Sequence, residues 1–240
     1  WKKMKTKTGT RAFLVVNVVL TVVLAAALVE TGYVSKVLRK ISGAHVPVTE
    51  TDHYKLMVWL HERPISQALA SPDIQIAFIG DSIIEGWLTS NILPNSLNLG
   101  ISRDTTPGLI ARAKPDLIAH VPTWYLGIGV NDALAATPPE EIAEYVAQLK
   151  TVFMPAERLI WRAVLPVTGA SWTPEKEAFR TAFKSAAQRA CQEMANCTFL
   201  TPPDGYGENT AEWSSDGLHP NAIGYRQLAQ QLCAEISCSP

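Results

Sequence analysis

The stretch that decides the fold is IAFIGDSIIE, residues 76–85. An apolar run ends in Gly-Asp-Ser and is followed at once by further apolar residues, a pattern that predicts a buried strand, a tight turn and the start of a helix. Ser82 would then lie at the carboxyl end of a strand, where the crevices of open α/β sheets form. A helix N-terminus beside it would stabilise negative charge. The pattern differs from the G-x-S-x-G elbow of α/β-hydrolases.

Strand and helix patterns alternate from residue 73 onward. The apolar strand candidates are residues 74–79, 96–99, 124–128, 158–164 and 197–200. The helix candidates are residues 105–114, 138–153, 174–194 and 221–236. Repeated β-α units with continuous apolar strands predict a parallel sheet that is covered by helices on both faces. We therefore predict a flavodoxin-like, three-layer α/β/α domain with a five-stranded parallel sheet over residues 73–240.

The chain before residue 73 has a different composition. Five cationic side chains precede an uncharged run of 18 residues over positions 12–29. A run of this length is enough for a transmembrane helix, which needs roughly 17–25 residues, and the basic flank predicts a cytoplasmic N-terminus. Residues 1–30 are thus predicted to be a basic tip with a transmembrane anchor, and residues 31–72 a membrane-proximal helical spacer.

Two interpretations of the apolar run stay open. The favoured one is an uncleaved anchor, which makes a single-pass protein of the inner (plasma) membrane with its catalytic domain on the periplasmic, extracytoplasmic side. The other is a cleavable signal peptide with the alanines at 25–27 as its cleavage site, which would release a secreted protein.

The amino-acid composition limits the classes of partner that the protein can bind. The chain is 47% apolar and 18% charged with a net charge of −1, so it can build a core and has no electrostatic basis for binding nucleic acid. The oligomeric state does not follow from the sequence. The cysteines all lie in the last 50 residues, at Cys191, Cys197, Cys233 and Cys238.

In an exported domain these cysteines predict one or two disulfides, with three possible pairings. Four unpaired, buried cysteines are the other interpretation. We expect no metal site, since the five residues between Cys191 and Cys197 exceed the spacing of two to four that is typical of zinc ligands.

Polar residues collect after the predicted strand ends, where acyl transfer would need them. A serine hydroxyl is a poor nucleophile until a base takes its proton, and His219 is the best candidate for that base. Asp216 precedes it by three residues, so its carboxylate could orient the ring and stabilise the imidazolium. Candidate oxyanion donors are the Ser82 N–H, the Asn131 side-chain amide and an N–H from the loop after Leu99.

These segments together resemble the SGNH, or GDSL-type, hydrolase superfamily. The matching blocks are GDS at 80–82, GVND at 129–132 and DGLHP at 216–220, and the similarity covers about residues 73–236. The run GISRDTT at 100–106 resembles the small acetylhydrolase and arylesterase branch, including the platelet-activating-factor acetylhydrolase subunits.

The resemblance implies a Ser82–His219–Asp216 triad, with no cofactor and no metal. It also implies an oxyanion hole of Ser82, Asn131 and an N–H of the second block, which falls on Arg103. Many relatives have glycine at that position. The Arg103 side chain could point to solvent or could bind an anionic or sugar-bearing substrate.

The leading functional hypothesis is a membrane-anchored serine ester hydrolase that acts on a small acyl ester or an acetylated glycan through an acyl-serine intermediate. One alternative is an O-acyltransferase that moves acetyl groups onto an envelope polysaccharide. Another is a catalytically silent, membrane-anchored binding protein. Trp172, Tyr206 and Trp213 are candidates for aromatic walls of the substrate pocket.

Overall fold

The computed structural model describes residues 7–30, 46–169, 171–206 and 210–238. The chain divides into two compact units, Trp1–Val46 and Pro47–Pro240. The second unit therefore includes part of the segment 31–72, which the sequence assigned to a spacer. It also contains all of the predicted site residues.

In the first unit the structure describes helix α1 (Lys7–Glu30), which covers the predicted membrane anchor over residues 12–29. Within the part of the chain that the structure describes, no helix has the length and apolarity needed to cross a bilayer. The anchor thus stays a prediction.

A five-stranded sheet forms the centre of the second unit, and all of its strand pairs are parallel. The strands are β1 (Ile76–Gly80), β2 (Ser96–Gly100), β3 (Thr123–Gly127), β4 (Arg158–Arg162) and β5 (Cys197–Leu200). Their order is β2-β1-β3-β4-β5, the order of flavodoxin-like sheets. The prediction of an α/β fold with a five-stranded parallel sheet is confirmed.

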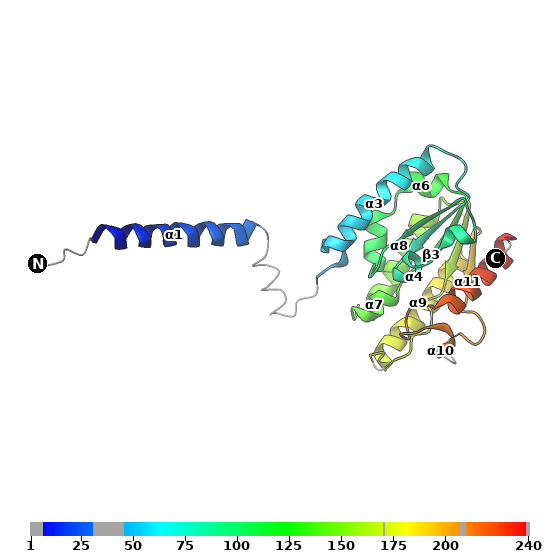
Figure 1. The fold of residues 1–240 in the computed structure, drawn as a ribbon. Helices are drawn as coiled ribbons and strands as arrows, with labels where there is room; N and C mark the ends of the chain where they lie inside the picture. The colour runs from blue at the N-terminus through cyan, green and yellow to red at the C-terminus, as the bar shows by residue number, and fades with distance from the viewer. Residues whose placement is uncertain (1–6, 31–45, 170, 207–209, 239–240) are drawn as a thin grey trace, which may run out of the picture. The chain divides into compact units, whose positions relative to one another are not determined.

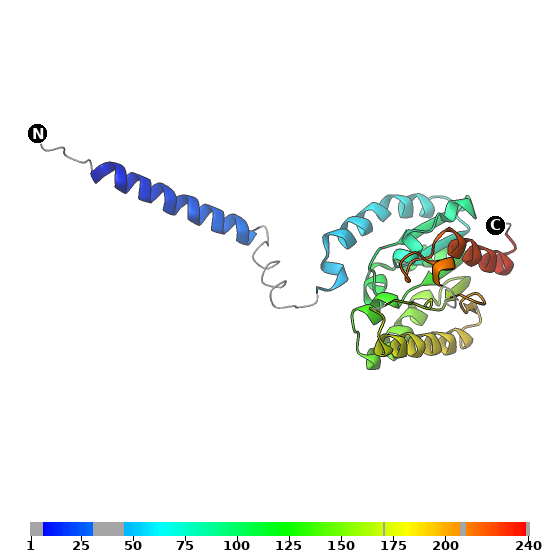
Figure 2. The ribbon, with the colours of Figure 1, turned by 60° about the horizontal axis from the view of Figure 1, so that its bottom comes forward.

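Helices cover both faces of the sheet, as expected for parallel strands (Figure 1). The first face packs on α3 (Asp52–Leu69), α5 (Thr106–Arg112), α6 (Pro115–His120), α8 (Ile142–Phe153) and α9 (Pro174–Gln192). The second face packs on α4 (Ser82–Glu85), α11 (Ala222–Ile236) and Trp213 of α10 (Thr210–Trp213). Figure 2 shows α9 and α11 on opposite sides of the sheet.

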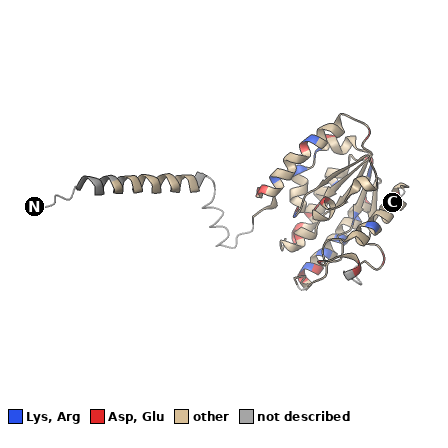
Figure 3. Cartoon of the chain, in the orientation of Figure 1, with Lys and Arg blue, Asp and Glu red and all other residues tan. Residues whose placement is uncertain are grey.

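Short elements complete the second unit. They are α7 (Val130–Leu134) and three 3-10 turns, η1 (Val48–Glu50), η2 (Thr89–Asn91) and η3 (Pro139–Glu141). Acidic and basic residues are interspersed over its helices, without a segregated basic surface in this view (Figure 3).

Two prolines bear on where the helices end. The helix expected over 105–114 ends at Arg112, because Pro115 disfavours helical geometry at Lys114, and Pro115 itself begins α6, a helix that the sequence did not predict. The second proline, Pro64, lies inside α3 and does not end it. Side chains on both sides of this proline, including Tyr54 and Ile65, are buried, so tertiary packing keeps α3 continuous.

Three strands end on glycine at the same level of the sheet. Gly80 of β1 lies in register with Gly100 of β2 and Gly127 of β3. A Cβ atom on Gly80 would lie 2.0 Å from the Gly127 carbonyl oxygen, and one on Gly100 would lie 2.1 Å from the Glu85 nitrogen. The loops that follow these strands therefore lie closer together than side chains larger than glycine at the strand ends would permit.

The cysteines form two local disulfides. Cys191 pairs with Cys197 and Cys233 pairs with Cys238, with Cα–Cα distances of 5.2 and 4.5 Å. Among the three pairings that the sequence left open, the structure has the one in which each cysteine bonds its nearest neighbour in the chain.

Candidate active site

Ser82 is the first residue of α4, directly after β1. Asp81 caps this helix, because its carboxylate accepts a hydrogen bond from the Ile83 N–H at 3.0 Å. The carboxylate is fully buried, and this burial raises its pKa, although the charge of Arg162 acts in the opposite direction. Asp81 therefore shapes the turn that presents Ser82.

Ser82 and His219 are 137 residues apart in the sequence and lie side by side in the structure. The Ser82 hydroxyl lies 2.9 Å from His219 Nε2, and His219 Nδ1 lies 2.6 Å from Asp216 Oδ2. A proton on Nδ1 that is donated to Asp216 leaves Nε2 free to accept the serine proton. His120, in contrast, contacts the Ser71 carbonyl oxygen, ahead of β1 and thus at the other end of the sheet.

Asp216 is held by its second carboxylate oxygen. Oδ1 accepts hydrogen bonds from the N–H groups of Leu218 and His219, at 2.9 and 2.8 Å, and from the Ser214 hydroxyl at 3.0 Å. Partial desolvation raises the pKa of this carboxyl, but the bonds from His219, Leu218 and Ser214 together bring it well below its ordinary value. Asp216 is therefore an anchored anion that faces the imidazole.

Asn131 reaches the site from α7, after β3. Gly129 precedes this helix with a φ of 118°, a value that side-chain-bearing residues rarely adopt. The Asn131 amide donates to the Asp104 carbonyl oxygen at 2.9 Å. Next to it, the buried Asp132 carboxylate accepts from the Thr106 N–H at 3.0 Å. Two adjacent side chains of α7 thus tie the β3 loop to the β2 loop.

Arg103 lies in the tight turn of the β2 loop. The turn is closed by a hydrogen bond from the Asp104 N–H to the Ile101 carbonyl oxygen at 3.0 Å, and Arg103 has a φ of 66°. The third position of a type II turn needs such a positive φ and favours glycine. A non-glycine residue in this region costs about 1–2 kcal/mol, so the departure from the glycine of many relatives introduces backbone strain.

Of the backbone N–H groups near Ser82, some already donate a hydrogen bond within the protein and others do not. The Gly100 N–H donates to the Asn98 side chain at 2.9 Å, so it does not serve an oxyanion. Among the backbone hydrogen bonds of the described residues, by contrast, none is donated by the N–H groups of Ser82 and Arg103. These two groups, with the Asn131 amide, are the set that the sequence predicted.

The side chain of Arg112 stabilises the same loop. The Arg112 Nε donates to Asp104 at 2.8 Å, while its two other nitrogens donate to the carbonyl oxygens of Leu99 and Gly80 at 2.7 and 3.0 Å. Burial raises the pKa of Asp104 to about 6, and the Arg112 charge acts against this rise. One guanidinium therefore joins the ends of β1 and β2 to the turn.

Sequence reasoning missed three of these supporting residues. Arg112 and Glu85, whose carboxylate accepts a hydrogen bond from the Ser102 N–H of the same turn, lie in helices, where a charged residue is usually taken as solvated surface. Arg162 is different, because it interrupts an otherwise apolar strand and is 2% exposed, with its Nη1 donating to the Ala163 carbonyl oxygen at 3.0 Å. A cation inside an apolar run was the available signal for it.

The suggested aromatic walls are wrong for two of three residues. Tyr206 and Trp213 are buried and pack on each other, with ring centroids 4.9 Å apart, in the core on the α11 face. Trp172 is half-buried, and its indole N–H donates to Glu177 at 2.9 Å.

The site contains acyl-transfer groups and no metal-ligand cluster. Among the residues that the structure describes, no three His, Cys, Asp or Glu side chains are grouped so that they could hold a metal ion. The side chains of Ser82, His219 and Asp216 lie in one hydrogen-bonded row, which is the geometry of a serine-hydrolase triad.

Comparison with known proteins agrees with this geometry. The GDSL-like Lipase/Acylhydrolase family matches residues 78–227. No curated protein matches the chain. Among solved structures, a protein from Streptococcus pneumonia named after platelet activating factor is 22% identical with a TM-score of 0.59, and the match covers 76% of this chain and 95% of that one.

Two further structures have the same fold. A GDSL-like lipase from Bacteroides thetaiotaomicron is 18% identical with a TM-score of 0.56, over 75% of this chain and 98% of its own. The acetylxylan esterase Axe2 from Geobacillus stearothermophilus is 22% identical with a TM-score of 0.54, over 67% and 93% of the two chains. The chain thus belongs to the GDSL-like lipase/acylhydrolase family and is a carboxylic ester hydrolase of the SGNH type.

Proposed function

We propose that this esterase removes small acyl groups, acetyl above all, from larger alcohols such as acetylated glycans, and that Ser82, His219 and Asp216 are its catalytic triad. The row of contacts from the Ser82 hydroxyl through His219 to Asp216, at 2.9 and 2.6 Å, carries the proposal. The acetylated substrate is suggested by the likeness to an acetylxylan esterase.

The reaction follows from the proton positions. His219 Nε2 takes the hydroxyl proton as Ser82 Oγ attacks the acyl carbon, and the carbonyl π electrons move onto oxygen. The N–H groups of Ser82 and Arg103 and the Asn131 amide stabilise that oxyanion. Collapse expels the alcohol, which receives the proton from His219. Water then attacks the acyl-Ser82 ester by the same steps, and the acid and free Ser82 result.

Exposure of the triad favours hydrolysis over acyl transfer. The His219 and Asp216 side chains are 42% and 52% exposed, so water has direct access to the acyl-enzyme. An open site also suits an acyl group that projects from a bulky alcohol. A transferase for an envelope polysaccharide would need to keep this water out.

The test compares p-nitrophenyl esters of increasing acyl length and acetylated xylo-oligosaccharides, with S82A as the inactive control. We expect hydrolysis that is fastest for acetyl and is lost in S82A. Full activity in S82A, or no hydrolysis of any ester by the wild-type protein, would contradict the proposal. If glycan in the assay receives the acetyl group in preference to water, the transferase alternative is correct.

We further propose that α1 anchors the enzyme in the membrane with its catalytic unit on the extracytoplasmic side. The uncharged run at 12–29 and the two disulfides support this, because disulfides persist in oxidising compartments. The full chain should stay with membranes through carbonate washing, and L20R/V23R should release it. In cells, its four cysteines should react with an alkylating reagent only after reduction.

A further inference from the structure

The turn that carries Arg103 has an unfavourable backbone conformation. Arg103 has a φ of 66° in the turn from Ile101 to Asp104, and its N–H is one of the proposed oxyanion donors. Type I and type II turns differ by a flip of the central peptide, which here is the Ser102–Arg103 peptide that carries this N–H. Because arginine does not favour the positive φ, contacts outside the turn must select the observed conformation.

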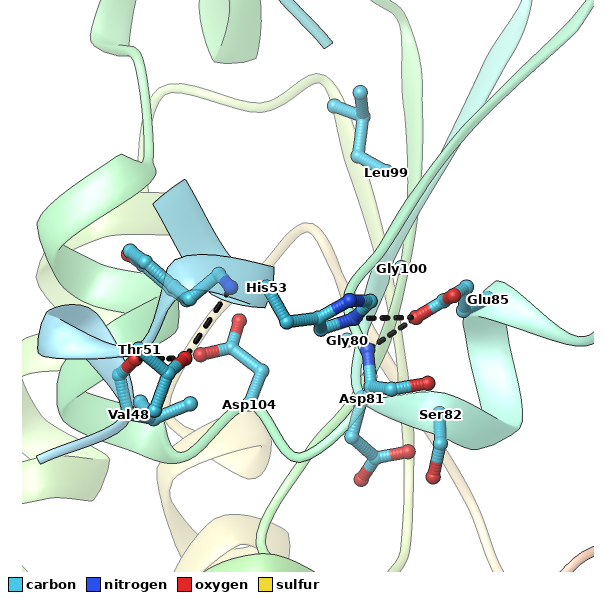
Figure 4. A network of polar contacts seen from close by, with 12 residues as sticks. Val48, Thr51, His53, Gly80, Asp81, Ser82, Glu85, Leu99, Gly100 and Asp104 are labelled. Atoms are coloured by element: carbon cyan, nitrogen blue, oxygen red, sulfur yellow. Dashed lines mark hydrogen bonds and ion pairs between the residues drawn. The ribbon is translucent and has the colours of Figure 1, made fainter. Parts of the chain in front are cut away.

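One such contact comes from Glu85. Its carboxylate accepts a hydrogen bond from the Ser102 N–H, at the residue immediately before Arg103. A carboxylate acceptor makes this bond stronger than one between neutral groups. Glu85 lies at the end of α4, whose first residue is Ser82. In Figure 4 the two side chains leave this helix in different directions.

The helix that joins Ser82 to Glu85 is fixed at its end. The carbonyl oxygen of Ile83 accepts from the Tyr225 hydroxyl at 2.9 Å, and that of Ile84 accepts from the Asn98 amide at 2.8 Å. One short, clamped helix therefore sets the position of the nucleophile and, through Glu85, that of the oxyanion turn.

A second element supports Glu85 from outside the matched family region. His53 of α3 places Nε2 3.8 Å from Glu85 Oε2, and Figure 4 shows its ring facing that carboxylate. The neighbouring Tyr54 anchors α3 by donating from its buried hydroxyl to the Gly108 carbonyl oxygen at 2.6 Å. Residues that precede the family match at 78–227 thus contact the edge of the site.

We propose that Glu85 is a positioning residue of this esterase: its carboxylate, 3.8 Å from His53 of α3, fixes the Ile101–Ser102 peptide at the start of the turn, and this orients the next peptide so that the Arg103 N–H faces the substrate oxyanion. The inference rests on the proposed function, because it assumes that Arg103 serves the oxyanion hole. Glu85 itself does not touch the substrate, and its effect on turnover passes through the turn.

The test begins with E85A and E85Q, measured against E62A. The control removes a glutamate of α3 whose carboxylate pairs with Lys114 at 2.8 Å. We expect kcat for p-nitrophenyl acetate to fall about 10- to 100-fold in E85A, the scale at which misplaced catalytic groups act, with KM nearly unchanged. E85Q keeps an uncharged acceptor and should fall less. E62A should match the wild-type protein, and H53A should lose no more than about fivefold.

A matched pair at Arg103 separates strain from side-chain chemistry. In the E85A background, R103G should regain most of the lost kcat, because glycine adopts the positive φ without the Cβ clash. R103A removes the same charge but keeps the Cβ atom, so it should regain none. The melting temperature of each variant is measured alongside, because relief of the strain at residue 103 also raises global stability; recovery of kcat by glycine alone in variants that are fully folded at the assay temperature supports the positioning role.

Three outcomes would overturn the inference. The first is a kcat within twofold of the wild-type value in both E85A and E85Q. The second is equal recovery by R103G and R103A. The third is a loss of kcat in E85Q that is fully explained by a lowered melting temperature, although this variant retains a hydrogen-bond acceptor. These results are distinct from failure of the proposed function, in which the wild-type protein neither hydrolyses the ester nor labels at Ser82 with a fluorophosphonate.

Discussion

The side-chain amide of Asn131 donates a hydrogen bond to the backbone carbonyl oxygen of Asp104 across 2.9 Å. This bond uses one amide hydrogen and leaves the other for a substrate. In the proposed mechanism Asn131 therefore has two tasks, since it ties the loop after β3 to the loop after β2 and supplies an oxyanion donor. The loop that it holds contains Arg103, so loss of Asn131 affects two of the three proposed donors.

Replacement of Asn131 by alanine should lower kcat by at least about 10²- to 10³-fold, the usual effect of removing one oxyanion donor. KM for p-nitrophenyl acetate should change little, because the donor acts mainly on the transition state. Steady-state kinetics of N131A test this. A matched A133G variant on the same helix would show the effect of disturbing α7 alone. A large rise in KM with unchanged kcat would contradict the assignment.

Replacement of Asp216 by asparagine should cost about 10⁴-fold in kcat, because an amide at this position favours the wrong imidazole tautomer. The pKa of Asp216 lies below its ordinary value, so the wild-type carboxylate stays ionised throughout the neutral range. D216N kinetics, with circular dichroism to verify folding, check the prediction. A folded D216N protein that keeps a tenth of wild-type kcat would show that another group orients His219.

Asp132 should make stability depend on pH. Burial raises its pKa from 3.8 to about 7, although bonds from Thr106 act against the rise. The folded state therefore binds a proton that the unfolded state has lost between pH 4 and 7, and stability falls as the pH rises through that window. At about 1.4 kcal/mol per pKa unit the change is at most about 4 kcal/mol.

Urea unfolding at pH 4.5 and pH 8 tests this prediction, with D132N as the comparison. Asparagine does not titrate, so the difference in unfolding free energy between the two pH values should be smaller in D132N. The buried Asp104, whose pKa is about 6, contributes a slope of the same sign in both proteins. Equal pH dependence in the two proteins would show that Asp132 is not protonated in the fold.

The Cys191–Cys197 disulfide should stabilise the domain without affecting catalysis. It closes a loop with a sequence separation of six, for which chain entropy gives about 2 kcal/mol. Cys197 begins β5, at the opposite end of the strand from the catalytic edge. C191A/C197A should therefore unfold at lower urea concentration with kcat unchanged. A drop in kcat of the folded variant would contradict this separation.

The parts of the site that the sequence predicts are those which topology places. Ser82 and Asn131 follow strand ends, and parallel strands bring their carboxyl ends to one edge. Asp216 and His219 are close in the chain, so one turn suffices to pair them. Their meeting with Ser82, 137 residues away in the chain, is predicted because they precede the helix that follows the last strand, and the path of the segment between β5 and α11 is what brings them there.

The remaining contacts depend on loop paths that no local pattern encodes. The positive φ of Arg103 is set by the whole turn, and the bond from Ser102 to Glu85 depends on where that turn lies against α4. The part of α3 in the compact unit was missed for a similar reason, because its polar face resembles a spacer helix while Tyr54, Ile65 and Ala68 are buried.

The glycines that end β1, β2 and β3 in one register also determine what can be redesigned in this enzyme. The loops that follow these three strands all begin at the same position along the sheet. The length and side chains of each loop can therefore vary without moving the strand end from which it starts. Exchange of the surface loops between family members is therefore a feasible route to new substrate preferences. The same exchange would fail if it replaced Gly80, Gly100 or Gly127, since a single added methyl group would push the loops apart.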